Sequence, residues 1–109
     1  MRVNIKATNI ELTAALRSYI IEKMNMLEKY LGNTVKVLHL DFEIEKTITN
    51  QNKGEIFRAE ANMEVPGNML RVEKTERDMY KAIDKVKDHM EIVIKRHKDK
   101  LEDKRRGKI

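Results

Sequence analysis

The chain has 109 residues, of which 40% are hydrophobic and 38% charged, so we expect one domain with a single modest core. It has no cysteine, which excludes disulfides and thiolate metal sites, and no stretch near the roughly 18 apolar residues that span a bilayer. The net charge is +5, and residues 95–109 carry the whole excess, with eight Lys and Arg against three Asp and Glu. This asymmetry favours a polyanionic partner, although a solvated tail that aids solubility explains it equally well.

A strand and a helix are the first elements expected along the chain. Residues 2–8 alternate apolar and polar side chains with the period of two that is typical of a half-buried strand. Thr13 can cap the helix that follows, in which apolar residues recur at spacings of three and four up to Leu31. Gly32-Asn33 then supplies the stop, so the pattern predicts one continuous helix.

Three strands are expected next. Residues 35–46 alternate in the same way, and the polar stretch 47–54 ends the pattern. Residues 57–65 form another row of apolar side chains, after which Pro66-Gly67-Asn68 turns the chain into a strand that contains Leu70 and Val72. The last two strands therefore form a hairpin.

The final element expected is a long helix. Thr75-Glu76-Arg77-Asp78 resembles a capping box that opens it, with Asp in place of the usual Glu at the third helical position. If the helix continues to about residue 103, it is on the order of 40 Å long, and its last turns project beyond a small domain. Its apolar stripe consists of Met79, Ile83, Val86, Met90, Val93, Ile94, His97 and Leu101.

The order of elements, β-α-β-β-β-α, predicts an α+β fold in which one four-stranded sheet has two helices packed on one face. We expect this domain to span residues 1–101 and a basic C-terminal tail to span residues 102–109. The other face of the sheet must meet solvent or a partner. The alternation predicts that this face is acidic, with Asp41, Glu43, Glu45, Arg58, Glu60, Asn62, Glu64, Arg71 and Glu73 on it.

Four segments, in the right order on these elements, resemble the ribosome hibernation-promoting factor and ribosome-associated inhibitor family. The resemblance covers about residues 1–101. It is carried by Asn4-Ile5-Lys6 through Asn9-Ile10-Glu11-Leu12-Thr13, Leu27-Glu28-Lys29-Tyr30, Asp78-Met79-Tyr80-Lys81-Ala82-Ile83-Asp84 and Arg96-His97-Lys98-Asp99-Lys100.

The N-terminus lacks the apolar core of a signal peptide, so we expect a cytoplasmic protein. The resemblance implies that it binds the 70S ribosome and, within it, the small ribosomal subunit. Its site would be the channel used by messenger RNA and the anticodon stems of transfer RNA, where it would silence idle ribosomes. Longer members continue into a second domain that pairs two ribosomes. The chain therefore looks like a short form, or the N-terminal piece of a long form.

The resemblance also implies an RNA-facing strip of basic residues on both helices. Double-helical RNA hides its base edges in a deep narrow groove and is held mostly through phosphates, riboses and shape, so a rigid row of cations suits it. Met26, His89 and Ile92 stand where the family usually has Lys or Arg, so the strip carries fewer permanent charges here. Lys81, which the family pattern does not specify, can compensate for this loss of charge. The candidate RNA-binding residues are therefore Lys23, Lys29, Lys81, Lys85, His89, Arg96, Lys98 and Lys100.

Catalysis and metal binding have little support in the sequence. His39, His89 and His97 lack metal-ligand spacing, and His97 falls on the apolar stripe, so we interpret it as structural. Glycine-rich phosphate loops and catalytic triads are absent. We therefore expect no enzyme activity, no cofactor, no metal ion, no small-molecule substrate and no membrane partner.

Two alternatives to ribosome binding remain open. One is a double-stranded-RNA-binding module that acts on other RNAs, although such a module needs a basic cluster at the start of its last helix, and Thr75 to Asp78 is near neutral. The other is a protein-interaction module that recruits a partner through the acidic sheet face and owes only solubility to its basic tail.

Overall fold

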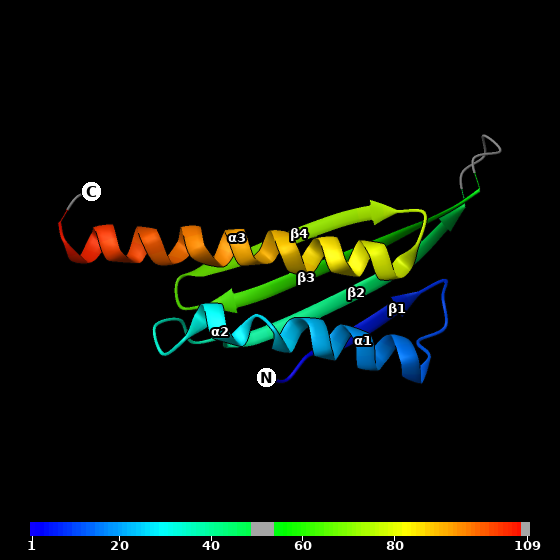
Figure 1. The fold of residues 1–109 in the computed structure, drawn as a ribbon, viewed down its shortest axis with the longest axis horizontal. Helices are drawn as coiled ribbons and strands as arrows, with labels where there is room; N and C mark the ends of the chain where they lie inside the picture. Colours follow the sequence, from blue (N-terminus) through cyan, green and yellow to red (C-terminus); the bar gives the residue numbers. More distant parts are fainter. Residues whose placement is uncertain (49–53, 108–109) are drawn as a thin grey trace.

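The computed structural model describes residues 1–48 and 54–107; of the polar stretch predicted at residues 47–54, residues 49–53 lie outside this description, as do residues 108 and 109 of the predicted tail. The described residues form four strands and three helical segments, and Figure 1 shows how they are arranged. Their bounds are β1 Asn4–Thr8, α1 Ala14–Asn25, α2 Glu28–Leu31, β2 His39–Ile48, β3 Glu55–Val65, β4 Asn68–Glu76 and α3 Met79–Arg105.

The four strands form one mixed sheet in the order β1-β2-β3-β4. β1 is parallel to β2, with Ile5 opposite Phe42, because the chain crosses over through α1 and α2 before β2. β2, β3 and β4 are antiparallel neighbours, and β3 and β4 form the predicted hairpin. The helices cover one face of this sheet, α3 over β3 and β4 with α1 beside it (Figure 1). The predicted α+β fold is thereby confirmed.

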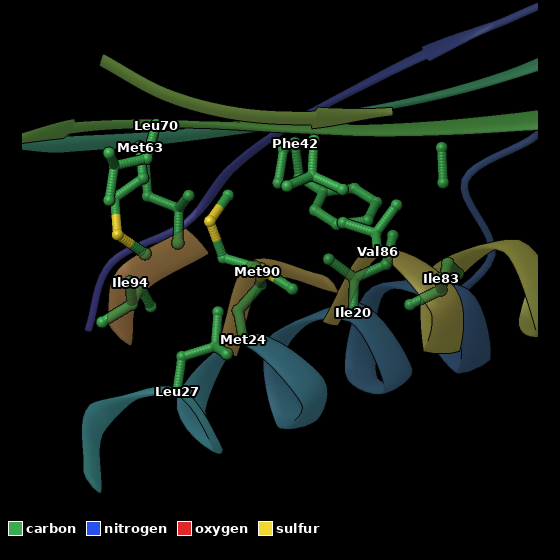
Figure 2. Close-up of a cluster of buried hydrophobic side chains, with 14 of the residues drawn as sticks. Ile20, Met24, Leu27, Phe42, Met63, Leu70, Ile83, Val86, Met90 and Ile94 are labelled. Carbon is green, nitrogen blue, oxygen red and sulfur yellow. The ribbon is translucent and has the colours of Figure 1, made fainter. Parts of the chain in front are cut away.

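The core lies between the sheet and the helices (Figure 2). Both layers contribute side chains that are at most 1% exposed, among them Phe42 of β2 and Met63 of β3 from the sheet, and Ile20 of α1 and Met90 of α3 from the helices. Burying a side chain of this size contributes about 1.5–3 kcal/mol, so this core is the main source of stability and holds α3 in a fixed orientation.

The first helical region differs from the prediction of one continuous helix. Thr13 caps α1 as predicted, since its Oγ1 accepts a hydrogen bond from the Leu16 amide at 3.1 Å. After Asn25, however, the Leu27 amide donates to the Met24 carbonyl three residues back, at 3.0 Å. This tighter turn separates α1 from α2 while Leu27 remains fully buried, so the apolar pattern continues although the helix does not.

The predicted capping box at Thr75 is wrong. Thr75 and Glu76 still pair with Arg58 and Phe57 of β3, and their backbones are therefore committed to the sheet. The helix begins only after Asp78, whose Oδ1 accepts a hydrogen bond from the Tyr80 amide at 2.9 Å. α3 then runs for 27 residues, on the order of 40 Å, and its C-terminal end extends past the sheet (Figure 1).

Candidate nucleic-acid interface

Five positions of the predicted strip share one side of α3. At 100° per residue, Lys85, His89, Ile92, Arg96 and Lys100 fall within an arc of about 80°. The arc lies on the side of α3 that faces β4, because all five side chains line grooves shared with β4 residues. The periodicity of the sequence therefore groups these five residues correctly.

Two open grooves run between this side of α3 and β4. The first, which we call the His89 groove, is lined by Lys74, Lys85, Asp88, His89 and Ile92. The second, the Arg96 groove, is lined by Asn68, Met69, Leu70, Arg71, Val93, Arg96, His97 and Lys100. Both grooves present cations from the helix and from the strand, which suits a chain of phosphates.

Strand β4 contributes two cations that the sequence analysis did not select. Lys74 lies in the His89 groove and Arg71 in the Arg96 groove. The alternation predicts Arg71 on the outer face of the sheet, where its Nε does donate to Asn62 Oδ1 at 2.6 Å, yet from the edge strand it also reaches the groove. Lys74 is two and four residues from the buried Val72 and Leu70, so it belongs to the row of β4 that faces the helices. This spacing is the one signal in the sequence that could have indicated Lys74.

Lys85 and His89 have contrasting surroundings. Lys85 forms an ion pair with Glu76 of β4, which lowers the pKa of that carboxyl group. His89 has its Nδ1 buried, and among residues 1–48 and 54–107 this atom has no hydrogen-bond partner. Burial first, and then the charges of Lys74 and Arg96, lower the pKa of His89 below its usual 6.5. The strip therefore contains a neutral imidazole near pH 7.

Lys23 of α1 and Lys98 of α3 lie where α3 packs against α1 and α2, on the side of α3 that faces away from the two grooves. Lys23 Nζ of α1 is 3.4 Å from Asp84 Oδ1 of α3 and 5.2 Å from the centre of the Tyr19 ring. Lys98 Nζ donates to the Tyr30 carbonyl of α2 at 2.8 Å. These two predicted RNA ligands thus connect the helices, and RNA would have to compete with their present partners.

Lys29 and Lys81 are exposed at the two ends of the helical layer. Lys29 lies in α2, with its Nζ 5.2 Å from the centre of the Tyr30 ring, and Lys81 lies in the first turn of α3. Next to Lys81, Tyr80 is 40% exposed and meets Tyr19 edge to face at a centroid distance of 4.8 Å. The predicted site residues therefore spread over two sides of α3 and do not form one row.

The outer face of the sheet has the acidic character predicted for it. Arg58 is surrounded by carboxylates from three strands, at 2.6 Å from Glu43, 2.9 Å from Glu45, 2.9 Å from Glu73 and 3.4 Å from Glu60. The hydrogen bond from Arg58 lowers the pKa of Glu43. One guanidinium among four carboxylates leaves this patch negative, so it should repel phosphate.

His97 fits the structural role predicted for it. His97 is 8% exposed and its Nδ1 lies 3.4 Å from Asn68 Nδ2, as expected for a residue on the apolar stripe. Within residues 1–48 and 54–107, no group of three or more His, Asp or Glu side chains is arranged to hold a metal ion. In the same residues, no helix is both long and apolar enough to cross a membrane.

Taken together, the fold and its charges define a small α+β domain with cations along its helices and carboxylates on its bare sheet face. Residues 3–102 match the family model described as sigma 54 modulation protein / S30EA ribosomal protein, and the chain belongs to this family. The resemblance inferred from four segments of the sequence is thereby confirmed.

Curated relatives and solved structures agree with this membership. The chain is 32% identical over 100 residues to a ribosome hibernation promoting factor of Pseudomonas putida, covering 92% of this chain and 89% of the relative. It is 31% identical over 101 residues to the protein of the same name in Escherichia coli, covering 93% and 97%.

Among solved structures, the N-terminal domain of Thermus thermophilus Protein Y superposes with a TM-score of 0.63 at 30% identity, covering 86% of this chain and 98% of that one. A ribosomal subunit interface protein of Coxiella burnetii superposes with a TM-score of 0.66 at 19% identity, covering 91% and 99%, and shows the shared fold.

Proposed function

We propose that this chain is a ribosome hibernation factor that binds ribosomal RNA of the small subunit through its helices and thereby stops translation. The names of the relatives in Pseudomonas putida and Escherichia coli support the link to hibernation. The binding mode follows from charge and shape, because a duplex of RNA offers a protein mainly phosphates and riboses.

The observation that carries the binding mode is the division of charge between the two faces of the domain. Lys85, Arg96 and Lys100 line the grooves along α3, whereas Arg58 on the sheet is surrounded by four carboxylates. Phosphate should approach the helical face and avoid the sheet. We infer that the site is the channel for messenger RNA and transfer RNA, since a one-sided domain of this kind suits a cleft walled by RNA, and that the protein acts in the cytoplasm.

Sedimentation of the purified protein with separated ribosomal particles tests the proposal. We expect the protein to cosediment with small subunits and with whole ribosomes, and not with large subunits alone. Transfer RNA bound to the small subunit should be displaced as the protein is added, and translation in a cell-free system should fall in parallel. Equal binding to large subunits would refute the assignment to the small subunit.

A further test separates the channel from the rest of the subunit surface. If the protein binds small subunits but leaves bound transfer RNA and translation unchanged at saturation, the channel assignment is wrong and only RNA binding stands. Ribonuclease treatment of the complex provides the control, because binding through the acidic sheet face to a ribosomal protein would survive digestion of the RNA.

A further inference from the structure

The His89 groove brings an imidazole and several cations of two elements to one place. Lys85 and His89 come from successive turns of α3, and Lys74 comes from β4 opposite them. Arg96 lies two turns beyond His89 on the same side of the helix and is close enough to lower the pKa of His89. Ile92, which is 50% exposed, supplies an apolar wall.

The acidic groups around His89 are already engaged with other cations. Glu76 of β4 pairs with Lys85, and Asp88 of α3 has Lys87 Nζ at 3.2 Å from its carboxylate. Lys74 has no ion-pair partner in the part of the chain that the structure describes, and neither has Arg96. The groove therefore has an excess of positive charge and lacks an anion that would balance it.

The surroundings of His89 make its protonation sensitive to a nearby anion. In the free protein its charged form is disfavoured, because Nδ1 of the half-buried ring is removed from water and the ring is close to the positive charges of Lys74 and Arg96. An anion in the groove offsets the repulsion from Lys74 and Arg96, since an opposite charge within about 4–6 Å favours the protonated imidazole. A protonated ring also gains a donor that can bond to the anion.

We propose that the His89 groove binds one phosphate group through Lys74, Lys85 and the protonated ring of His89, and that binding takes up one proton. The proposal rests on the proposed function in one respect, namely that the phosphate belongs to ribosomal RNA. Two features go beyond the predicted helix strip: Lys74 of β4 becomes a ligand, and RNA binding becomes dependent on pH.

The sign of the pH dependence follows from the two states of His89. The pKa is lowered in the free protein and is higher in the complex, so the complex holds more protons between the two values. The affinity for RNA therefore rises as the pH falls through the pKa that His89 has in the complex. It levels off below the pKa that His89 has in the free protein. Each unit between the two values strengthens binding about tenfold.

The first experiment measures the dissociation constant for small ribosomal subunits from pH 7.5 to pH 5.5 at constant salt. We expect binding to become about tenfold tighter over this range, for a difference of one unit between the two states. His89→Gln should bind weakly with little change over the range. His89→Lys should bind at every pH about as tightly as the unchanged protein does at pH 5.5.

His39→Gln is the matched control. His39 lies at the start of β2, next to Asp41 and away from α3, so its loss should leave the pH profile unchanged. If His89→Gln keeps the full pH dependence, or if binding of the unchanged protein is flat from pH 7.5 to pH 5.5, the proposal is wrong. A thermal melt of each variant establishes that it is folded.

The second experiment uses the protein without ribosomes and so does not depend on the proposed function. The titration of the His89 ring is followed by nuclear magnetic resonance in sulfate and in chloride at equal ionic strength, because sulfate stays a dianion over this pH range. Sulfate should raise the pKa of His89, and Lys74→Gln should reduce that rise. An identical titration in both salts overturns the phosphate site, even if the protein binds small subunits.

Discussion

At the scale of single residues, Arg96 offers the cleanest test of the helical face. It is exposed on the side of α3 that lines the Arg96 groove, whereas Lys6 is an equally charged residue on the outer face of the sheet, with 78% of its side chain exposed. Arg96→Gln should weaken binding to small subunits and make the log-log salt dependence shallower by about 0.7–0.9 units, the increment for one phosphate contact. Titrations at several salt concentrations measure both effects.

Lys6→Gln removes the same charge and is the control for Arg96→Gln. Because Lys6 lies beside Glu43 and away from the helices, this variant should keep the salt slope of the unchanged protein. Equal slopes in the two variants would show that net charge drives the binding and that the position of the cation on α3 is irrelevant.

Tyr19 allows a residue-scale prediction about stability. Its hydroxyl donates to Asp84 at 2.5 Å, and this bond, then burial and the charges of Asp84 and Glu22, raises the pKa of Tyr19 to about 12. The raised pKa favours the folded protein below about pH 10, and this contribution is lost as the pH rises from about 10 to about 12. Tyrosinate absorbance should show a late-ionising group that disappears in Tyr19→Phe and ionises earlier in Asp84→Asn.

At the scale of elements, the start of α3 is determined by a competition between sheet and helix. Thr75 pairs with Arg58 in the sheet, so the cap falls to Asp78. Asp78→Ala should lower the free energy of unfolding by about 0.5–2 kcal/mol, the usual cost of losing a cap, and Thr13→Ala at α1 should cost a similar amount. Urea denaturation measures both.

Thr75→Ala is the comparison that distinguishes the two possible caps. If Thr75 capped the helix, this variant would be destabilised as much as Asp78→Ala. Because the Thr75 side chain is exposed in β4, we expect this variant to lose less stability than Asp78→Ala. Surface substitutions away from caps and the core usually change the free energy of unfolding by about 0.5 kcal/mol or less.

At the scale of the whole molecule, the chain beyond Lys100 separates long-range attraction from direct contact. Cutting there removes Lys104, Arg105, Arg106 and Lys108 together with Glu102 and Asp103, a net loss of +2. The cut also removes Leu101, which packs against the edge of the core, whereas residues 102–107 are exposed, so the melting temperature should fall only slightly. Binding to small subunits should weaken more at low salt than at physiological salt, because screening suppresses long-range attraction.

The opposite result would relocate the binding site. If the truncated chain no longer binds small subunits while Arg96→Gln binds normally, the basic C-terminal end is the RNA-binding element and the grooves along α3 are not. The structure gives this end a definite form, since α3 continues as a helix through Arg105.

The fold of this protein follows largely from local patterns in its sequence. Periods of two and of three to four residues predict which side chains face the core, and these patterns depend only on the geometry of strands and helices. They placed Phe42, Met63 and Met90 in the core, where all three are at most 1% exposed. The pattern failed at Met26–Leu27 and Thr75, where a tight turn and pairing with β3 override local preference.

In the candidate site, too, some features follow from the sequence pattern and others only from the packing of the elements. The sequence by itself determined that Lys85, His89, Arg96 and Lys100 share one side of a helix, because this depends on spacing alone. Only the tertiary structure decided that Lys74 of β4 joins them, that Lys23 and Lys98 are held by Asp84 and Tyr30, and that Nδ1 of His89 is buried. These facts depend on which elements pack together, and the charge, solvation and partners of a side chain are properties of that packing.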